Sequence, residues 1–269
     1  MHLQNNRFKH FSYCLRFGGV LILTALIAGL GGILLHEFLD LIEYLVFGHG
    51  ETSTTQAVSS KQFILIVLAG IISAILWCFL QRKNRQIISV KSQMKAESPA
   101  SKMPKLWIHL TNIFLQVASV GAGSPIGKEG APRELGALGA GRVSDYLKLT
   151  LQDRKLTIAC GASAGLAAVY QVPVASIFFA FETLGLGISV LNLISVSVTT
   201  ILASIVAGVV ISDAPLYETA QVTLDVKTAI LAMFLVVLIS PIAQLFRRLT
   251  QKCTSPKNRL TPTFYGACH

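Results

Sequence analysis

Charged residues are scarce in this chain. Only 13% of its 269 residues are Asp, Glu, Lys or Arg, whereas 52% are hydrophobic. This balance excludes an ordinary soluble domain, in which about 25% of the residues are charged. The sequence also lacks a phosphate-binding glycine loop, a dinucleotide fingerprint and a nucleotide-binding tail domain. Its five cysteines are widely spaced without a C-x-x-C pair, so they predict free thiols rather than a metal site or a disulfide framework.

The chain contains several long runs without a charged residue. A transmembrane helix needs about 20 such residues. The runs cover residues 17–35, 62–81, 106–127, 156–181, 183–212 and 228–246. No small-residue cleavage site follows the first run, which is therefore interpreted as a retained span rather than a signal peptide. The sequence predicts an all-α polytopic membrane protein.

The formal net charge of +10 is explained by topology. Lys and Arg gather in segments 82–105, 148–155 and 247–259, whereas Asp and Glu gather in 37–51 and 213–225. Loops rich in Lys and Arg mark the cytoplasmic side of a membrane protein. The pattern predicts an integral membrane protein with both termini cytoplasmic, and it predicts no nucleic-acid partner.

Two uncharged runs carry residues that break helices. Segment 106–141 starts and ends at cytoplasmic loops, so it must enter and leave the membrane by the same face. Glycine and proline are dense in its middle, at Gly121, Gly123, Pro125, Gly127, Gly130 and Pro132. A second break is expected at 170–173, before Pro173. Irregular backbone at membrane depth is tolerated only where protein or water covers it, and two broken helices point to a transport site.

Lys128 and Glu129 lie at the first of these breaks. A helix is predicted to start near Gly130 and to run to about Arg142, which turns its free N–H groups and its positive dipole end toward the break. Such an end binds anions. Glu129 is itself an anion at that end, so it would act as a gate, with Lys128 adding positive potential. The alternative is that Glu129 only caps the helix and pairs with Lys128 or Arg133.

At this point the sequence resembles a known family. Gly-Lys-Glu-Gly at 127–130 is similar to the G-(K/R)-E-G-P motif of the CLC chloride channels and proton/chloride exchangers. The segment 161–182, GASAGLAAVYQVPVASIFFAFE, resembles that family's small-residue helix, Asn-Ala-Pro break and helix ending in glutamate. The resemblance covers roughly residues 12–250. It implies a homodimer with one anion pathway per subunit, built from two inverted repeats in each chain, and it places the family's gate glutamate at Glu129.

The resemblance also implies an anion-binding set. Backbone amides around the two breaks would bind the anion, at Gly127, Lys128, Glu129, Gly130, Val172 and Val174. The family's Gly-Ser-Gly-Ile-Pro motif is not present, and Ser92, or else Ser89, is the residue that stands in its place by position. The proline of the first motif is one place late, at Pro132. These departures from the family pattern imply a divergent prokaryotic branch, and with it the plasma membrane of a bacterium.

Proton coupling departs from the family pattern as well. In proton-coupled members a glutamate directly follows the position that matches Glu182, but this chain has Thr183 there. Glu182 and Thr183 are therefore the candidates for a proton or water path. The alternative for Glu182 is a carboxylate at the membrane edge, bonded to a helix end. The expected function is chloride transport, as a channel or an exchanger, and a fluoride-selective exporter of the same family is the alternative.

The resemblance divides the chain into three parts. These are a cytoplasmic segment 1–16, a CLC-like transmembrane region 17–248 with the first repeat and the first helix of the second, and a polar tail 249–269. The family's Gly-x-Phe-x-Pro motif has no counterpart, and Tyr265 lies in a polar tail, so it does not take the place of the pore tyrosine. The expectation is a truncated product with little activity, or a chain that pairs with a second half-length polypeptide.

Two further function classes match parts of the sequence. Residues 161–165 match the G-x-S-x-G pattern of hydrolases, and a membrane protease would need His109 as its base. That pattern requires a strand before the serine, so helix packing through small residues is the preferred interpretation. The other class is a membrane interaction subunit without transport of its own. No enzymatic activity, cofactor or metal is predicted.

Overall fold

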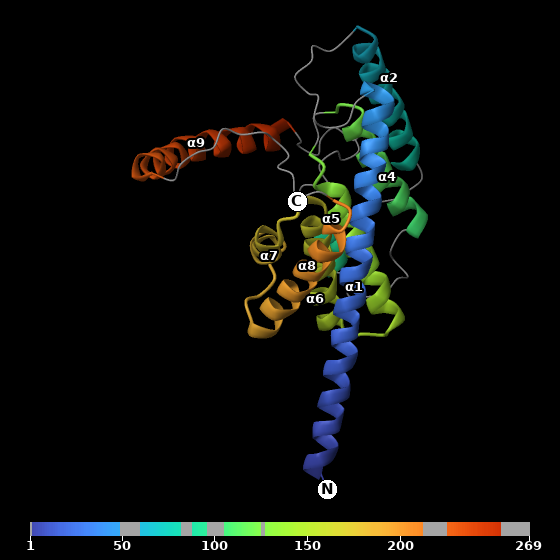
Figure 1. Cartoon of the computed structure of the whole chain (residues 1–269), viewed down its shortest axis with the longest axis vertical. Helices are drawn as coiled ribbons and strands as arrows, with labels where there is room; N and C mark the ends of the chain where they lie inside the picture. The colour runs from blue at the N-terminus through green and yellow to red at the C-terminus, as the bar shows by residue number, and fades with distance from the viewer. Residues whose placement is uncertain are drawn as a thin grey trace. The chain divides into compact units, whose positions relative to one another are not determined.

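The computed structural model describes residues 2–48, 60–81, 88–95, 105–124, 127–211 and 225–253. In these ranges the regular elements are all α-helices, which confirms the predicted all-α class (Figure 1). Their bounds are α1 His2–Phe47, α2 Ser60–Gln81, α3 Val90–Lys95, α4 Leu106–Gly121, α5 Gly130–Tyr146, α6 Leu151–Tyr170, α7 Pro173–Glu182, α8 Val190–Gly208 and α9 Val226–Cys253. Pro125, Tyr265, most of the basic loop 82–105 and the acidic segment 213–224 lie outside the described residues.

Within the described ranges, four helices are long and apolar enough to cross a membrane. Their apolar parts are Leu15–Phe47, Phe63–Leu80, Val190–Gly208 and Val226–Phe246. The apolar helices α4 and α7 have 16 and 10 residues, fewer than the ~20 that a span needs. The structure thus confirms a polytopic membrane protein, and it confirms that segment 106–141 and run 156–181 are each divided between two shorter helices.

Helices α5 and α6 form a hairpin through glycine contacts. A Cβ atom added to Gly136 would overlap the carbonyl oxygen of Gly161, and one added to Gly165 would overlap the carbonyl oxygen of Pro132. The two backbones therefore touch, as small residues allow in membrane helices. Because Gly165 lies beside Pro132, the end of α6 is level with the start of α5.

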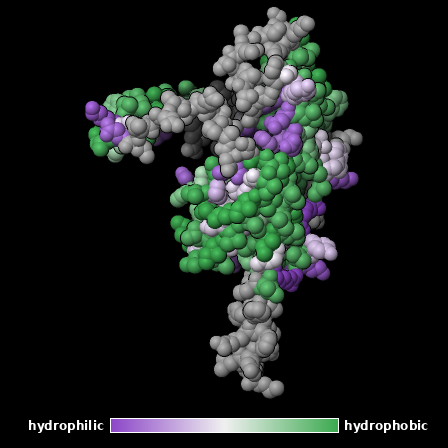
Figure 2. All heavy atoms as spheres, in the orientation of Figure 1, coloured by the Kyte–Doolittle hydropathy of each residue, from purple (hydrophilic) through white to green (hydrophobic). Residues whose placement is uncertain are grey.

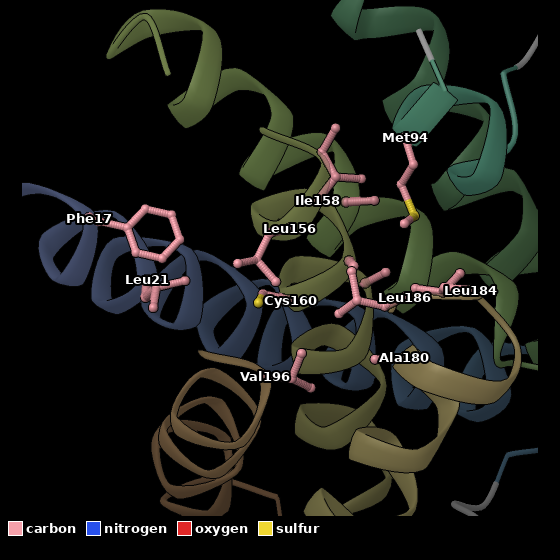
Figure 3. Packing of buried hydrophobic residues seen from close by; sticks show 13 residues of the cluster. Phe17, Leu21, Met94, Leu156, Ile158, Cys160, Ala180, Leu184, Leu186 and Val196 are labelled. Carbon is pink, nitrogen blue, oxygen red and sulfur yellow. The ribbon is translucent and has the colours of Figure 1, made fainter. Parts of the chain in front are cut away.

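Helix α6 is the centre of the first unit, and α1 and α8 cover it. Figure 3 shows Phe17 and Leu21 of α1 and Val196 of α8 pointing toward Leu156 and Cys160 of α6. The core is built largely from small side chains, since the buried residues of α6 include Ala159, Ala162, Ala164, Ala167 and Ala168, all with no exposed area. Packing of this kind brings the helix axes close together and orders the breaks between them.

The outer face of this unit is apolar. Large side chains of α1 and α8 are half or more exposed, among them Ile22, Leu30, Ile194 and Ile205. Figure 2 shows a hydrophobic surface over the part of the unit that carries these helices. Exposed apolar area of this extent is expected of a surface that faces lipid.

The chain divides into two units, Met1–Asp213 with α1 to α8 and Ala214–Phe264 with α9. Helix α9 has 28 residues, with Pro241 in its interior. Its large apolar side chains are exposed along its length, including Val226, Phe234, Val237 and Phe246. The predicted boundaries at residues 16 and 248 are not tested by this division and remain predictions.

Candidate functional site

The first break lies between α4 and α5. Helix α4 ends at Gly121, and Gly123 takes a φ of +93°, which glycine adopts without strain. The amide of Ser124 donates to the carbonyl of Ser119 at 3.0 Å, which closes the end of α4. Helix α5 then begins at Gly130, where the sequence predicts it.

The predicted end of α5 was wrong by one turn. Helix α5 runs to Tyr146 rather than to about Arg142. No proline or glycine lies between Arg142 and the end of α5 at Tyr146. The Ser144 hydroxyl also donates back to the carbonyl of Ala140 at 2.7 Å. The helix stops only where Lys148 takes a φ of +50°.

Glu129 occupies the N-cap position of α5 without capping it. Its side chain makes no cap hydrogen bond, and its backbone is helical, with φ −72° and ψ −25°. The exposed carboxylate lies against the Cα atom of Gly127, so closely that a Cβ there would overlap it. Arg133 donates from Nε to the main-chain carbonyl of Glu129 at 2.8 Å, not to the carboxylate. Among the residues that the structure describes, neither the cap nor a pair with Lys128 or Arg133 forms.

The second break lies beside the first. Lys128 Nζ lies 5.8 Å from the ring centroid of Tyr170, the last residue of α6. Arg133 Cζ lies 5.4 Å from the ring centroid of Phe179 in α7. The structure therefore brings residues 127–130 close to the end of α6, where the sequence could only predict two separate breaks.

The second break has the predicted form. Helix α6 ends at Tyr170, Gln171 takes a φ of +54°, and α7 begins at Pro173. Val172 has no side-chain cap, and its carbonyl accepts the first helical bond from Ser176 at 3.1 Å. Val172 and Val174 are 42% and 65% exposed. The first amides of α7 after the proline thus have no partner within the helix, which gives a second positive helix end.

Side-chain hydrogen bonds hold this second break in place. Gln171 donates from Nε2 to the carbonyl of Ala168 at 2.8 Å and accepts at Oε1 from the Ser204 hydroxyl at 2.9 Å. Ser204 belongs to α8. The left-handed residue that ends α6 is therefore tied to α8.

The other predicted site residues lie apart from the two breaks. Ser92 is exposed on α3 and bonds to Ser89 through their hydroxyls at 3.0 Å. The next residue, Gln93, accepts at its carbonyl from Arg154, at the opposite end of α6 from Tyr170. Glu182 is the last residue of α7 and Thr183 follows it as the C-cap, both exposed. The structure does not bring these residues to Glu129.

Sequence reasoning missed a buried polar cluster beside the first break. Glu134 of α5 accepts from His109, Asn112 and Gln116 of α4, and Asn112 accepts from Trp77 of α2. The three donors stand at intervals of three and four residues, so they share one face of an otherwise apolar helix. This spacing is the signal that the sequence offers for the cluster, whereas the hydrolase pattern assigns His109 only the role of a base.

The hydrolase pattern lies in the middle of α6. Residues 161–165 are helical, Ser163 is fully buried, and Gly161 and Gly165 touch the backbone of α5. No strand precedes this serine, because α6 is continuous from Leu151. The stretch is a helix-packing surface.

The comparisons with known proteins agree with this architecture. The family model described as voltage gated chloride channel matches residues 73–267. Over 169 residues the chain is 28% identical to the voltage-gated ClC-type chloride channel ClcB of Yersinia pseudotuberculosis and of Yersinia pestis, a match that covers 61% of this chain and 40% of the relative. It is 39% identical over 100 residues to the ClcB of Escherichia coli K12, covering 37% of this chain and 24% of the relative. The matches thus span less than half the length of these relatives.

Proposed function

This chain belongs to the voltage-gated chloride channel family, and on that premise we propose that it forms part of a transmembrane chloride pathway in which the Glu129 carboxylate is the gate. An anion that enters gives up water and is stabilised by the backbone N–H groups of Gly127, Lys128, Glu129 and Gly130 and of the first turn of α7 with Val172 and Val174. Glu129 competes with the anion for the start of α5.

The position of the Glu129 side chain carries this proposal. The carboxylate lies at the positive end of α5 without a cap hydrogen bond or an ion pair within the described residues. A permanent structural role would require such a partner, because an anion beside free helix amides gains most when it bonds to them. A carboxylate that is near these amides but unbound can leave when it is protonated or when a dissolved anion replaces it.

The nearby cations supply positive potential without filling the site. Lys128 lies near the ring of Tyr170 and Arg133 near the ring of Phe179, at distances typical of cation–π contacts. Contacts of this kind hold a cation in place beside a ring without removing its positive charge. Both cations then favour an anion between the two breaks.

The test is anion efflux from vesicles that contain the purified full chain. Glu129→Gln keeps the size of the side chain but removes its charge, so chloride efflux is expected to rise and to lose its pH dependence. Glu37→Gln, an exposed carboxylate on α1, serves as the matched control and is expected to keep the pH dependence. Unchanged flux and pH response in Glu129→Gln would refute the gate. Efflux of fluoride but not of chloride would show that the chain is instead a fluoride-selective exporter of the same family.

Assembly and orientation are part of the same proposal. The expected homodimer, or a pair with a second half-length chain, would complete the walls around the two breaks. Cross-linking of the purified protein in lipid distinguishes a monomer from a dimer. Labelling of an introduced cysteine near residue 10 from either side of bacterial inner-membrane vesicles tests the cytoplasmic N-terminus.

A further inference from the structure

We propose that His109 and Glu134 form a proton-binding site within the helix bundle, separate from Glu129, whose occupancy acts on the start of α5 and on Trp77. The two side chains are 1% and 10% exposed, and His109 Nδ1 lies 2.9 Å from Glu134 Oε1. Ionisable side chains at this depth in a membrane protein are expensive to bury and are functional candidates for that reason. This inference does not depend on the proposed gate.

The carboxylate of Glu134 is arranged as an acceptor. Asn112 donates from Nδ2 to Oε2 at 2.9 Å, and Gln116 donates from Nε2 to the same oxygen at 3.2 Å. Amide nitrogens can only donate, so Oε2 has to accept both bonds. This arrangement suits an ionised Glu134, with His109 as the third partner on Oε1.

The Nε2 atom of the His109 ring can accept a proton. This atom is buried and has no hydrogen-bond partner in the described part of the chain. With a neutral ring, the pair carries a buried charge of −1. When Nε2 takes a proton from solvent hydronium, its lone pair forms an N–H bond and the pair becomes neutral overall.

The charged side chain next to the pair in sequence is Arg133, which donates from Nε to the main-chain carbonyl of Glu129. The further ionisable side chains described on α1, α2 and α5 are Arg16, His36, Glu37, Asp40, Glu43, Tyr44, Cys78, Arg133, Arg142, Asp145 and Tyr146; on α4, His109 is the one such residue. His36 pairs with Asp40, and Asp145 pairs with Arg154. None of the described side chains forms an ion pair with His109 or Glu134 apart from the pair itself.

Two bonds connect the pair to its surroundings. Gln116, which donates to Glu134, turns its Oε1 toward Gly130, where an added Cβ would lie 2.6 Å from that oxygen. Asn112, which also donates to Glu134, accepts from Trp77 Nε1 at 2.9 Å. A proton on His109 weakens the hold of Glu134 on both amides, because the carboxylate is then drawn toward the charged ring. The change thus reaches the first residue of α5 and an indole ring in α2.

Trp77 provides a direct readout without transport. The chain has two tryptophans, and Trp107→Phe leaves Trp77 as the reporter in the full-length protein. The emission of Trp77 in detergent or lipid is expected to change in a single transition as the pH is lowered from about 8 to about 5. His109→Gln and Glu134→Gln are each expected to abolish that transition. His36→Gln, a histidine of α1 outside the cluster, is expected to keep it.

The outcomes separate this inference from the proposed gate. An emission that is constant from pH 5 to 8, or a transition that persists in both His109→Gln and Glu134→Gln, would overturn the proton site. Glu129→Gln is expected to keep the Trp77 transition whatever it does to anion flux. Failure of the gate therefore shows in flux alone, and failure of the proton site shows in fluorescence alone.

A second measurement covers the case in which the two variants do not fold. Of the two histidines whose side chains the structure describes, His36 and His109, His109 is the buried one, so with ring-labelled ¹⁵N-histidine in the unmutated chain its signal is expected to be shielded from a soluble paramagnetic ion. Its nitrogen shifts are expected to move toward those of imidazolium as the pH falls. A shielded ring that keeps one neutral form over the whole range would overturn the proposal.

Discussion

The carboxylate of Glu129 lies directly against the Cα atom of Gly127, two residues before it, at the start of α5. Any side chain at position 127 would meet that carboxylate, so the glycine creates the space in which Glu129 rests. In the proposed pathway this space is also where an anion approaches the free amides of α5.

Gly127→Ala is therefore expected to open the gate. The added methyl group overlaps the Glu129 carboxylate and forces it away from the helix end. We expect chloride efflux to rise to the level of Glu129→Gln, measured in vesicles at neutral pH. The double variant is expected to show no further increase, because each change alone already removes the negative charge of Glu129 from the start of α5. An efflux in Gly127→Ala equal to that of the unmodified chain would show that Glu129 does not obstruct the path.

Gly165→Ala is expected to destabilise the hairpin of α5 and α6. A Cβ there would overlap the carbonyl oxygen of Pro132, and backbone cannot move aside as easily as a side chain. Overpacking of this kind costs about 1–3 kcal/mol. The measurement is the thermal unfolding midpoint in detergent. Gly70→Ala on α2, with no atom within 4 Å of the added Cβ, is the control, and its midpoint is expected to stay or to rise. Equal decreases in both variants would contradict the contact.

Gln171→Val is expected to weaken the second break. Residue 171 has a φ of +54°, which costs a β-branched side chain of order 1–3 kcal/mol, and valine also loses the bonds to Ala168 and Ser204. We expect a lower unfolding midpoint. Gln171→Asn is the matched control, since asparagine tolerates this conformation and keeps an amide, so most of the stability is expected to remain. A valine variant as stable as the asparagine variant would argue against strain at this position.

The sequence was most informative where a local rule governs the backbone. The glycines between Gly121 and Gly130 and the proline at 173 predicted both breaks, because these residues act on their own segment. The uncharged runs predicted the membrane helices for the same reason. The end of α5 was the weaker prediction, since its last turn depends on Ser144 and Lys148 rather than on a helix breaker.

Packing between segments could not be read from the sequence. That Lys128 lies beside Tyr170 follows from the glycine contacts of α5 with α6, which pair residues some thirty positions apart. The cluster around Glu134 was likewise out of reach, because its donors belong to α4 and its carboxylate to α5. The family resemblance predicted Ser92 as an anion-binding residue from its position in the sequence. Its helix α3, however, lies near the start of α6 rather than beside Glu129.

The most direct test of the central claim is calorimetric titration of chloride into the purified protein and into Glu129→Gln at the same pH. If the carboxylate and the anion compete for the start of α5, the glutamine variant binds chloride more tightly, and lowering the pH narrows the difference because Glu129 is then protonated. Equal affinities at every pH would contradict the claim that Glu129 occupies the anion's place.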